Sequence, residues 1–164
     1  MEDPLDGRTA LVTGASSGIG AATARVLAED GADVCLAARR VERLESLADE
    51  IRDATDAAVS VVPTDVTDSD AVRALVDATV ERFGSLDIVV CNAGLGIDKP
   101  VAELTDEEYR LMTGVNVDGM FYTAREALPH LEASEGNLVF LGSMSGNHPR
   151  PHNPVYAATK WWVR

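Results

Sequence analysis

The sequence predicts an α/β fold of the Rossmann type: a doubly wound parallel sheet with helices on both faces, in three layers. Short apolar runs alternate along the whole chain with longer segments whose apolar residues recur at helical spacing, as in a parallel sheet with right-handed crossovers. The run Leu86–Cys91 is apolar almost throughout, which is expected for a strand covered on both faces. A glycine-rich turn joins the first apolar run to the first helical segment. These features predict a single domain over residues 1–164.

The first half of the chain is expected to contain three strands with helices between them. The strands are expected at Thr9–Thr13, Asp33–Ala38 and Ala58–Val62. Two helices are expected where apolar residues follow a 3.6-residue period, at Ile19–Glu29 and Val41–Asp53. Gly31 stands where a helix commonly ends in the left-handed conformation.

Two capping boxes mark helix starts in the second half. Thr67 is followed three residues later by Asp70, and Thr105 by Glu108, the spacing at which two side chains satisfy free backbone N–H groups. The first of these helices is expected to end at Gly84.

The helical pattern that follows the second capping box reaches Leu131 and is expected to be interrupted on the way. The interrupting residues are Gly114, Asn116 and Gly119. A fifth strand is expected at Leu138–Leu141, and a last helix is expected to begin at Tyr156.

Charge and composition exclude several classes of protein. The formal net charge of −13 would repel nucleic-acid phosphates. No run of about 18 apolar residues predicts a membrane span, and the acidic segment 1–6 lacks signal-peptide features. We therefore expect a cytoplasmic protein. Only Lys99 and Lys160 of the 14 basic residues are lysines, which fits a protein built for high salt and equally an acidic protein from a GC-rich genome.

The cysteines and histidines do not suggest metal chemistry. Cys35 and Cys91 lie in apolar runs without a C-x-x-C motif, so both are expected to be buried. His130, His148 and His152 lack metal-ligand spacing. We therefore expect no metal site.

The glycine-rich loop Thr13–Gly20, T-G-A-S-S-G-I-G, follows the first strand and opens the first helix. Gly14 permits a sharp turn, Gly18 lets the backbone approach a pyrophosphate, and Gly20 lets the helix pack close to the strand. The helix N-terminus adds free N–H groups and a partial positive charge. No Lys-Ser or Lys-Thr follows the glycines, which excludes a Walker-type loop. The predicted dinucleotide contacts are Gly14, Ser16, Ser17, Gly18, Ile19 and Gly20, and the alternative is a turn without ligand.

The end of the second strand indicates which dinucleotide binds. NAD-binding domains usually place Asp or Glu there for the ribose 2′-OH. This chain has Ala38, Arg39 and Arg40 instead, and guanidinium groups pair well with a 2′-phosphate. We therefore predict NADP(H) rather than NAD(H) as the cofactor. The alternative is that both arginines only cap the surface of the next helix.

Three further motifs complete a resemblance to a known family. Asn92-Ala93-Gly94 follows the fourth strand, Ser143 follows the fifth, and Tyr156-Ala157-Ala158-Thr159-Lys160 comes last. With the glycine loop, these motifs resemble the classical short-chain dehydrogenase/reductase family in order and spacing, over essentially the whole chain. Tyr156 and Lys160 also share one helix face, where an ammonium lowers the pKa of a tyrosine.

The resemblance implies an oxidoreductase that moves a hydride between the nicotinamide and an alcohol or ketone. Tyr156 would exchange the proton at the substrate oxygen, and Lys160 would also hold the nicotinamide ribose. Ser143 would hydrogen-bond the substrate, and Asn116 would hold a water in a proton relay from Lys160. Taken singly, each residue has a structural alternative. Tyr156 and Lys160 could be a helix-surface pair. Ser143 could be a polar turn residue, as Ser145 could, and Asn116 could be a helix irregularity.

The resemblance also implies contacts with the adenosine half of the cofactor. Asp65 and Val66, after the third strand, would lie beside the adenine. The three residues near the adenosine ribose would be Asn92, Ala93 and Gly94. Asp65 is equally explained as a turn residue before the next helix.

The end of the chain departs from the family pattern. The sequence stops four residues after Lys160, where family members continue with two more strands and a substrate-covering segment. A fragment, a natural truncation and a partial record all fit this ending. The family packs the helix after Thr105 and the helix at Tyr156 against partner copies, so we expect a homo-oligomer, a dimer or a tetramer.

Two other functions fit parts of the sequence. A non-catalytic dinucleotide-binding module, or an inactive truncated fragment, would keep the glycine loop without turnover. An epimerase or dehydratase of the extended relatives would also carry Tyr-x-x-x-Lys, but with a G-x-x-G-x-x-G loop. The G-x-x-x-G-x-G spacing of this chain favours the oxidoreductase.

Overall fold

The computed structural model describes residues 3–164 and places five strands in one parallel sheet. The strands are β1 (Thr9–Thr13), β2 (Asp33–Ala38), β3 (Val59–Pro63), β4 (Ile88–Cys91) and β5 (Asn137–Phe140). Their order is β3-β2-β1-β4-β5, with every neighbouring pair parallel. The predicted Rossmann-type fold is confirmed, and the order reverses beside β1, where doubly wound sheets bind ligands. Residues 1 and 2 of the acidic segment, on which the signal-peptide interpretation partly rests, lie outside the described residues.

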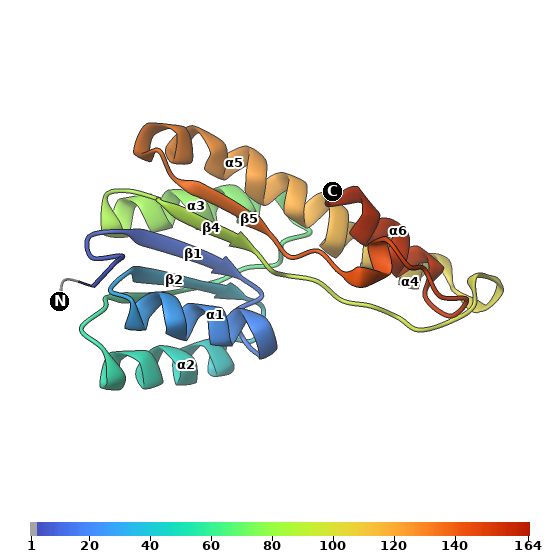
Figure 1. The fold of residues 1–164 in the computed structure, drawn as a ribbon, viewed down its shortest axis with the longest axis horizontal. Helices are drawn as coiled ribbons and strands as arrows, with labels where there is room; N and C mark the ends of the chain where they lie inside the picture. Colours follow the sequence, from blue (N-terminus) through green and yellow to red (C-terminus); the bar gives the residue numbers. More distant parts are fainter. Residues whose placement is uncertain (1–2) are drawn as a thin grey trace.

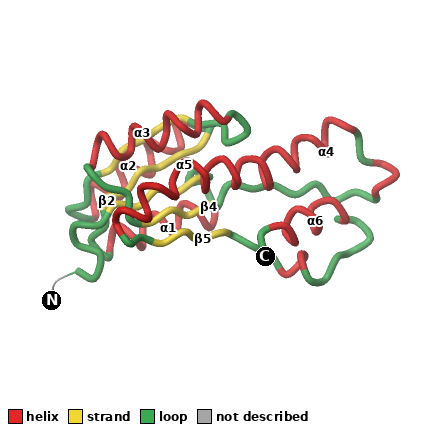
Figure 2. The backbone as a smooth tube through the Cα atoms, turned by 90° about the horizontal axis from the view of Figure 1, so that it is seen from above, coloured by secondary structure: helices red, strands yellow, loops and turns green. Residues whose placement is uncertain are grey.

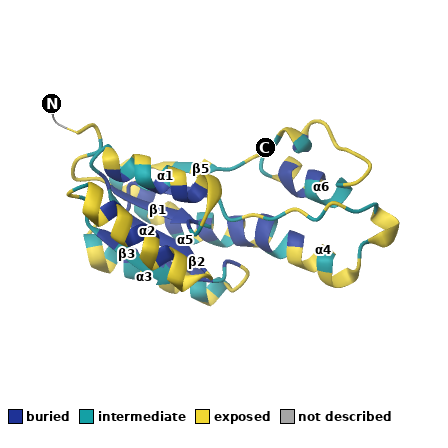
Figure 3. Ribbon diagram, turned by 90° about the horizontal axis from the view of Figure 1, so that it is seen from below, coloured by how far each residue is buried: buried dark blue, intermediate teal, exposed yellow. Residues whose placement is uncertain are grey.

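Helices cover both faces of the sheet. They are α1 (Gly18–Glu29), α2 (Val41–Ala54), α3 (Ser69–Phe83), α4 (Asp106–Thr113), α5 (Gly119–Ser134) and α6 (Pro154–Trp162). Figure 1 shows α1 and α2 on one face and α3 and α5 on the other. Successive residues of a strand point to opposite faces, so Leu11 joins the apolar cluster under α3 and α5 while Val12 joins the one under α1 and α2. The three central strands, β2, β1 and β4, are therefore buried between two helix layers, whereas the edge strands β3 and β5 are partly exposed (Figure 3).

Helices α4 and α6 lie together beyond the carboxyl ends of the strands, not on the sheet (Figure 2). The chain reaches α4 through a long segment after β4, and it reaches α6 through a segment after β5. Side chains from α6 are thereby brought to the edge of the sheet where the glycine-rich loop lies.

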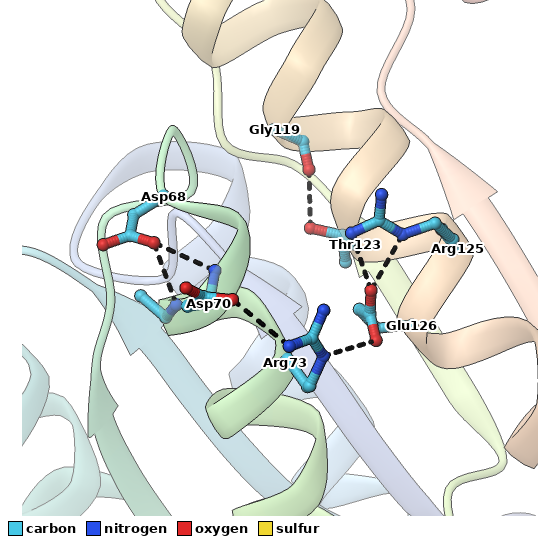
Figure 4. Close-up of polar contacts among 8 residues, drawn as sticks. Asp68, Asp70, Arg73, Gly119, Thr123, Arg125 and Glu126 are labelled. Atoms are coloured by element: carbon cyan, nitrogen blue, oxygen red, sulfur yellow. Dashed lines mark hydrogen bonds and ion pairs between the residues drawn. The ribbon is translucent and has the colours of Figure 1, made fainter.

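Polar contacts join α3 to α5 on the outer face of the sheet (Figure 4). Arg73 on α3 pairs with Asp70 at 3.2 Å and with Glu126 on α5 at 3.5 Å. Arg125 donates a 2.8 Å hydrogen bond to the same Glu126 carboxylate. Exposed pairs of this kind contribute up to about 1 kcal/mol each, so they align the two helices while the apolar cluster beneath supplies most of the stability.

One predicted capping box is confirmed and the other is wrong. Thr105 accepts from the Glu108 N–H at 3.2 Å, and the Glu108 side chain accepts from the Thr105 N–H at 3.0 Å. At α3 the N-cap is Asp68, not Thr67, because the Asp68 carboxylate accepts from two backbone N–H groups of the first turn. The Thr67 hydroxyl instead donates to Asp65. Gly84 ends α3 in the left-handed conformation, as predicted.

The predicted interruption of the long helix is a change of helix type rather than a break. A π-helical segment, Gly114–Asp118, joins α4 to α5 without leaving helical backbone. Such widened turns occur often at functional sites. The last helix begins at Pro154, two residues before the predicted start, because proline fits the first position of a helix. The predicted bounds of β1 and β2 are confirmed, and those of β3, β4 and β5 differ by one or two residues.

Both cysteines are buried, as predicted, and burial raises the pKa of Cys35 to about 11 and that of Cys91 to about 12. No helix within residues 3–164 combines the length and apolar character needed to cross a bilayer. In the same part of the chain, no group of three or more His, Cys, Asp or Glu side chains could hold a metal ion.

Candidate active site

A cavity of about 480 Å³ opens at the carboxyl ends of the strands, within the range of small-molecule sites. Thirteen of the predicted site residues line it: Gly14, Ser16, Ser17, Ile19, Arg39, Arg40, Asp65, Val66, Asn92, Ala93, Gly94, Tyr156 and Lys160. Gly18, Gly20, Asn116 and Ser143 are predicted site residues that do not line it. The cavity joins the glycine-rich loop at one end to α6 at the other.

The glycine-rich loop is shaped by two close backbone approaches. At Gly14, where φ is +66°, a Cβ would come within 2.8 Å of the Ala93 Cα. At Gly20, a Cβ would come within 2.6 Å of the Gly14 carbonyl oxygen and would collide with the Asn92 amide. Gly18 also has a positive φ, +58°, but open space surrounds the position of its missing Cβ. The absence of a Cβ at Gly14 and Gly20 therefore lets the loop pack closely against the segment after β4, whereas the space beside Gly18 is free.

Asn92 holds this loop against the end of β4. Its side-chain amide donates to the carbonyl oxygens of Thr13 at 2.9 Å and of Gly14 at 3.2 Å. The Thr13 hydroxyl in turn accepts from the backbone N–H groups of Asn92 and Ala93, at 3.1 and 3.2 Å. These reciprocal bonds fix the loop before any ligand binds.

The N-terminus of α1 faces this fixed loop and fits an anionic group. Ser17 is the N-cap, its side chain accepts no hydrogen bond from the helix, and the first turn carries no acidic residue. The first N–H groups of the helix and its partial positive charge are therefore available to an anion. With the open space at Gly18, the residues present fit the pyrophosphate of a dinucleotide.

The two arginines after β2 line the cavity. Arg40 is the N-cap of α2 but makes no side-chain cap bond; its Nη2 donates to Ser16 at 2.8 Å and to Ser17 at 2.7 Å. Arg39 lies 4.0 Å from the Asp65 carboxylate. The pKa of Asp65 is lowered, mainly because its carboxylate accepts a hydrogen bond from the Thr67 backbone N–H. The bond from the Thr67 hydroxyl and the charge of Arg39 add to this effect, and together they outweigh desolvation. The Arg40 guanidinium is therefore directed at the glycine-rich loop rather than at the surface of its own helix.

Tyr156 and Lys160 on α6 form the other end of the cavity. Lys160 is 4% exposed, and its ammonium donates to the Leu141 carbonyl oxygen at 2.7 Å. The same nitrogen lies 5.9 Å from the centre of the Tyr156 ring. Burial lowers the pKa of Lys160 below its ordinary value of 10.5. The Tyr156 ring packs over Gly96, where a Cβ would lie 3.2 Å from the ring.

Asn116 lies behind the cavity, fully buried in the π-helical segment. Its oxygen accepts from the Leu95 N–H at 2.9 Å, and its amide donates to the Leu95 carbonyl at 2.8 Å and to the Thr159 hydroxyl at 3.0 Å. A Cβ on Gly94 would lie 3.3 Å from the Asn116 oxygen and 3.4 Å from the Lys160 ammonium. Asn116 thus ties the segment after β4 to α6, close to Lys160, and the water relay stays a prediction.

Ser143 stands apart from the other predicted catalytic residues. Its hydroxyl oxygen accepts from the Ser145 N–H at 3.1 Å and caps a short 3-10 helix, Met144–Gly146. Leu141 and Gly142, just before it, line the cavity. The structure therefore brings the chain at Ser143 to the cavity but does not bring its side chain into the lining.

Seven residues that line the cavity were not predicted as site residues, namely Ala38, Thr64, Leu95, Gly96, Val115, Leu141 and Gly142. All except Val115 lie at the carboxyl end of a strand or in the segment that follows it, so the rule that parallel strands bind ligands at their carboxyl ends could have found them. Val115 is different, because its place in the lining depends on the π-helical turn.

The fold and this cavity define a dinucleotide-binding domain of the Rossmann class. The family model of the short chain dehydrogenases matches residues 8–164. The chain therefore belongs to the short-chain dehydrogenase family.

Known relatives support this assignment. An uncharacterized oxidoreductase of Staphylococcus aureus is 41% identical over 157 residues, which are 95% of this chain and 67% of the relative. An alcohol dehydrogenase of Thermococcus sibiricus, solved with 5-hydroxy-NADP, superposes with a TM-score of 0.93 at 38% identity, over 95% of this chain and 66% of its own. A short-chain dehydrogenase/reductase of Burkholderia phymatum, solved with NAD, superposes with a TM-score of 0.93 at 33% identity. The match covers 99% of this chain and 58% of that protein. The chain thus spans about two thirds of the length of its relatives.

Proposed function

We propose that this chain carries the cofactor site and proton-transfer group of an NADP(H)-dependent oxidoreductase acting on an alcohol or ketone. The observation that supports this most strongly is the single cavity that joins the glycine-rich loop to the Tyr156–Lys160 pair. When bound, the nicotinamide cofactor would supply the hydride chemistry. The residues of this chain would orient the cofactor and substrate and move the proton.

In this proposal, Tyr156 exchanges the proton at the substrate oxygen, and Lys160 provides a positive charge that favours the phenolate. The ammonium is held in place by its hydrogen bond to the Leu141 carbonyl. Asn116 would hold a relay water near Lys160, and Ser143 would hydrogen-bond the substrate oxygen. The Ser143 oxygen accepts from the Ser145 N–H, and its hydroxyl proton would be the one donated to the substrate oxygen.

The preference for NADP(H) is supported by charge at the adenosine end. Arg40 and Arg39 stand where NAD-binding domains usually place an acidic side chain. Solved relatives include complexes with each kind of cofactor, so the preference of this chain has to be argued from its own residues. Titration of the protein with NADPH and with NADH, followed by nicotinamide fluorescence, tests the preference. Tighter binding of NADPH is expected, and equal or tighter binding of NADH would overturn it.

A second candidate is a dinucleotide-binding module without turnover, which the place of Ser143 outside the cavity lining favours. A broad panel of alcohols with NADP⁺, and of ketones with NADPH, separates the two candidates. Oxidation or reduction of any member supports the enzyme. Cofactor binding with no reaction across the panel supports the module.

We further propose self-association into a homo-oligomer through α4, α5 and α6. Four aromatic side chains on these helices are exposed, namely Tyr109, Phe121, Trp161 and Trp162, and exposed apolar side chains mark association surfaces where they cluster. Light scattering after gel filtration measures the mass directly. A dimer or tetramer is expected, and a monomer at micromolar concentration would contradict the proposal.

A further inference from the structure

Helix α6, which carries Tyr156 and Lys160, is positioned by polar contacts more than by apolar packing. It lies beyond the carboxyl ends of the strands rather than on the sheet (Figure 2). Its buried residues are Ala157, Thr159 and Lys160, of which only Ala157 is apolar. Apolar burial is non-directional, so one buried alanine does not fix the rotation of the helix about its axis. The orientation of Tyr156 therefore depends on the hydrogen bonds that α6 makes.

Two side chains of α6 hydrogen-bond to other elements within residues 3–164. The Lys160 ammonium donates to the Leu141 carbonyl oxygen at 2.7 Å, and the Thr159 hydroxyl oxygen accepts from the Asn116 amide at 3.0 Å. Thr159 is 3% exposed and Lys160 is 4% exposed, so water does not readily replace either bond. One bond reaches the residue after β5 and the other reaches the π-helical segment, so the two hold α6 against different parts of the chain.

These two bonds lie on either side of the direction in which Tyr156 points. Successive residues of an α-helix are rotated by about 100° around its axis. Viewed along the axis, Thr159 therefore lies about 60° to one side of Tyr156, and Lys160 lies about 40° to the other side. A single bond would leave the helix free to turn about it, whereas two bonds on opposite sides resist rotation both ways. Thr159 provides the second of these bonds.

The Thr159 hydroxyl also binds the backbone of Tyr156 itself. It donates to the Tyr156 carbonyl oxygen at 2.8 Å while it accepts from Asn116. Asn116 is in turn bonded to both the N–H and the carbonyl of Leu95. The Tyr156 ring packs over Gly96 of the same segment. The ring and the backbone of Tyr156 are therefore both held against the segment that follows β4.

We propose that Thr159 is a positioning residue, which fixes the rotation of α6 through Asn116 and so holds the Tyr156 phenol at the reacting end of the cavity. This inference rests on the proposed function, because it assumes that Tyr156 exchanges a proton with the substrate. Thr159 does not line the cavity, so it acts on the reaction through Tyr156. Proton transfer requires hydrogen-bond reach, and a displacement of about 1 Å can lower a rate about a hundredfold.

Three substitutions in the full-length protein test this role. Valine matches the shape of threonine without its hydroxyl, so Thr159→Val leaves one buried N–H of the Asn116 amide unpaired, whereas Thr159→Ser keeps the hydroxyl. Thr79→Val is the matched control. Thr79 is fully buried on α3 and donates to the Leu75 carbonyl oxygen at 2.8 Å, but it does not line the cavity. Thermal melts verify that each variant folds, and Thr159→Ala removes the hydroxyl without bulk should the valine variant not fold.

Steady-state kinetics with NADPH and a ketone that the wild type reduces give kcat and KM separately. Thr159→Val is expected to lower kcat at least about tenfold, with the KM for NADPH unchanged. Thr159→Ser should restore most of kcat, and Thr79→Val should leave it unchanged. An unchanged kcat in Thr159→Val, an equal loss in Thr79→Val, or no recovery with serine would overturn the proposal.

Amide hydrogen exchange, localised to residues 154–162 by mass spectrometry, follows α6 without turnover. Local opening raises the exchange of the segment that opens, so this segment is expected to exchange faster in Thr159→Val than in the wild type or in Thr79→Val. Unchanged exchange would overturn the role of Thr159 while the proposed function stands. A wild type that reduces no ketone and oxidises no alcohol would instead overturn the proposed function, and this inference with it.

Discussion

The cofactor end and the catalytic end of the cavity are built in different ways. At the cofactor end, Gly14 and Gly20 leave no room for a Cβ, and the Asn92 amide donates to the loop carbonyl oxygens at 2.9 and 3.2 Å. At the catalytic end, Tyr156 and Lys160 sit on a short helix beyond the sheet, held through Asn116 and Leu141. The first end is fixed by the sheet that supports it. The second depends on contacts between segments far apart in sequence. A substitution that disrupts one end should therefore leave the other end intact.

The largest effect is expected from Gly20→Ala at the cofactor end. Its Cβ would meet the Gly14 carbonyl oxygen at 2.6 Å, and overpacking against backbone costs about 1–3 kcal/mol of unfolding free energy. The displaced loop should also lose at least tenfold in cofactor affinity. Urea unfolding and NADPH titration measure the two effects.

Gly84→Ala is the matched control for this prediction. Gly84 ends α3 with φ of +87°, and nothing surrounds the position of its missing Cβ. Backbone strain alone should cost about 1–2 kcal/mol and leave cofactor affinity unchanged. Equal loss of affinity in both variants would show that the glycine-rich loop is not specifically locked.

A smaller effect on cofactor binding is expected from Asn116→Ala at the catalytic end. The substitution leaves the Leu95 N–H and carbonyl without their partners, and an unsatisfied buried group costs about 1–3 kcal/mol. The expected result is lower stability and much lower turnover, with adenosine binding retained. Chemical denaturation and 5′-AMP binding measure these separately. Loss of 5′-AMP binding in a folded Asn116→Ala protein would contradict the independence of the two ends.

The smallest effects concern pH, and the two ends should respond in different pH ranges, with stability rising with pH in both. The pKa of Asp65 is lower in the folded chain than its ordinary value of 3.8, so its contribution to stability is present above that value and is lost as pH falls through the folded pKa. The pKa of Lys160 is also lowered, by burial, so its cost is present below the folded pKa and is relieved as pH rises towards 10.5.

Difference melting curves isolate these two pH effects from other titrating groups. Subtracting Asp65→Asn from the wild type should leave an acid-side slope, and subtracting Lys160→Met should leave an alkaline-side slope of stability rising with pH. A flat difference curve for either variant would show that its group does not couple to folding.

The same contrast governs how much the sequence could predict. The glycine-rich loop, its register after β1 and the helix ends at Gly31 and Gly84 follow from local rules, and the structure bears out their positions. Thr67 was a wrong N-cap because Asp68 offers a carboxylate one residue later and Asp65 takes the threonine hydroxyl. Local pattern alone cannot rank two adjacent capping side chains.

At the catalytic end, the sequence predicts less of the detail, because the geometry depends on distant contacts. The sequence indicated an irregular helix near Asn116, but the π-helical turn that buries it against Leu95 follows from tertiary packing. The interpretation of Ser143 relied on spacing, and spacing does not determine whether the hydroxyl faces the cavity or the Ser145 N–H.

The most direct test of this account uses the variant Tyr156→Phe. Cofactor binding and turnover are both measured on one preparation of the full-length protein. Removing the phenol hydroxyl eliminates the proposed proton exchange, worth about 10²–10⁴-fold in rate, and leaves the glycine-rich loop untouched. The account predicts NADPH affinity equal to that of the wild type and turnover reduced at least a hundredfold. Unchanged turnover, or loss of both properties in a folded protein, would contradict it.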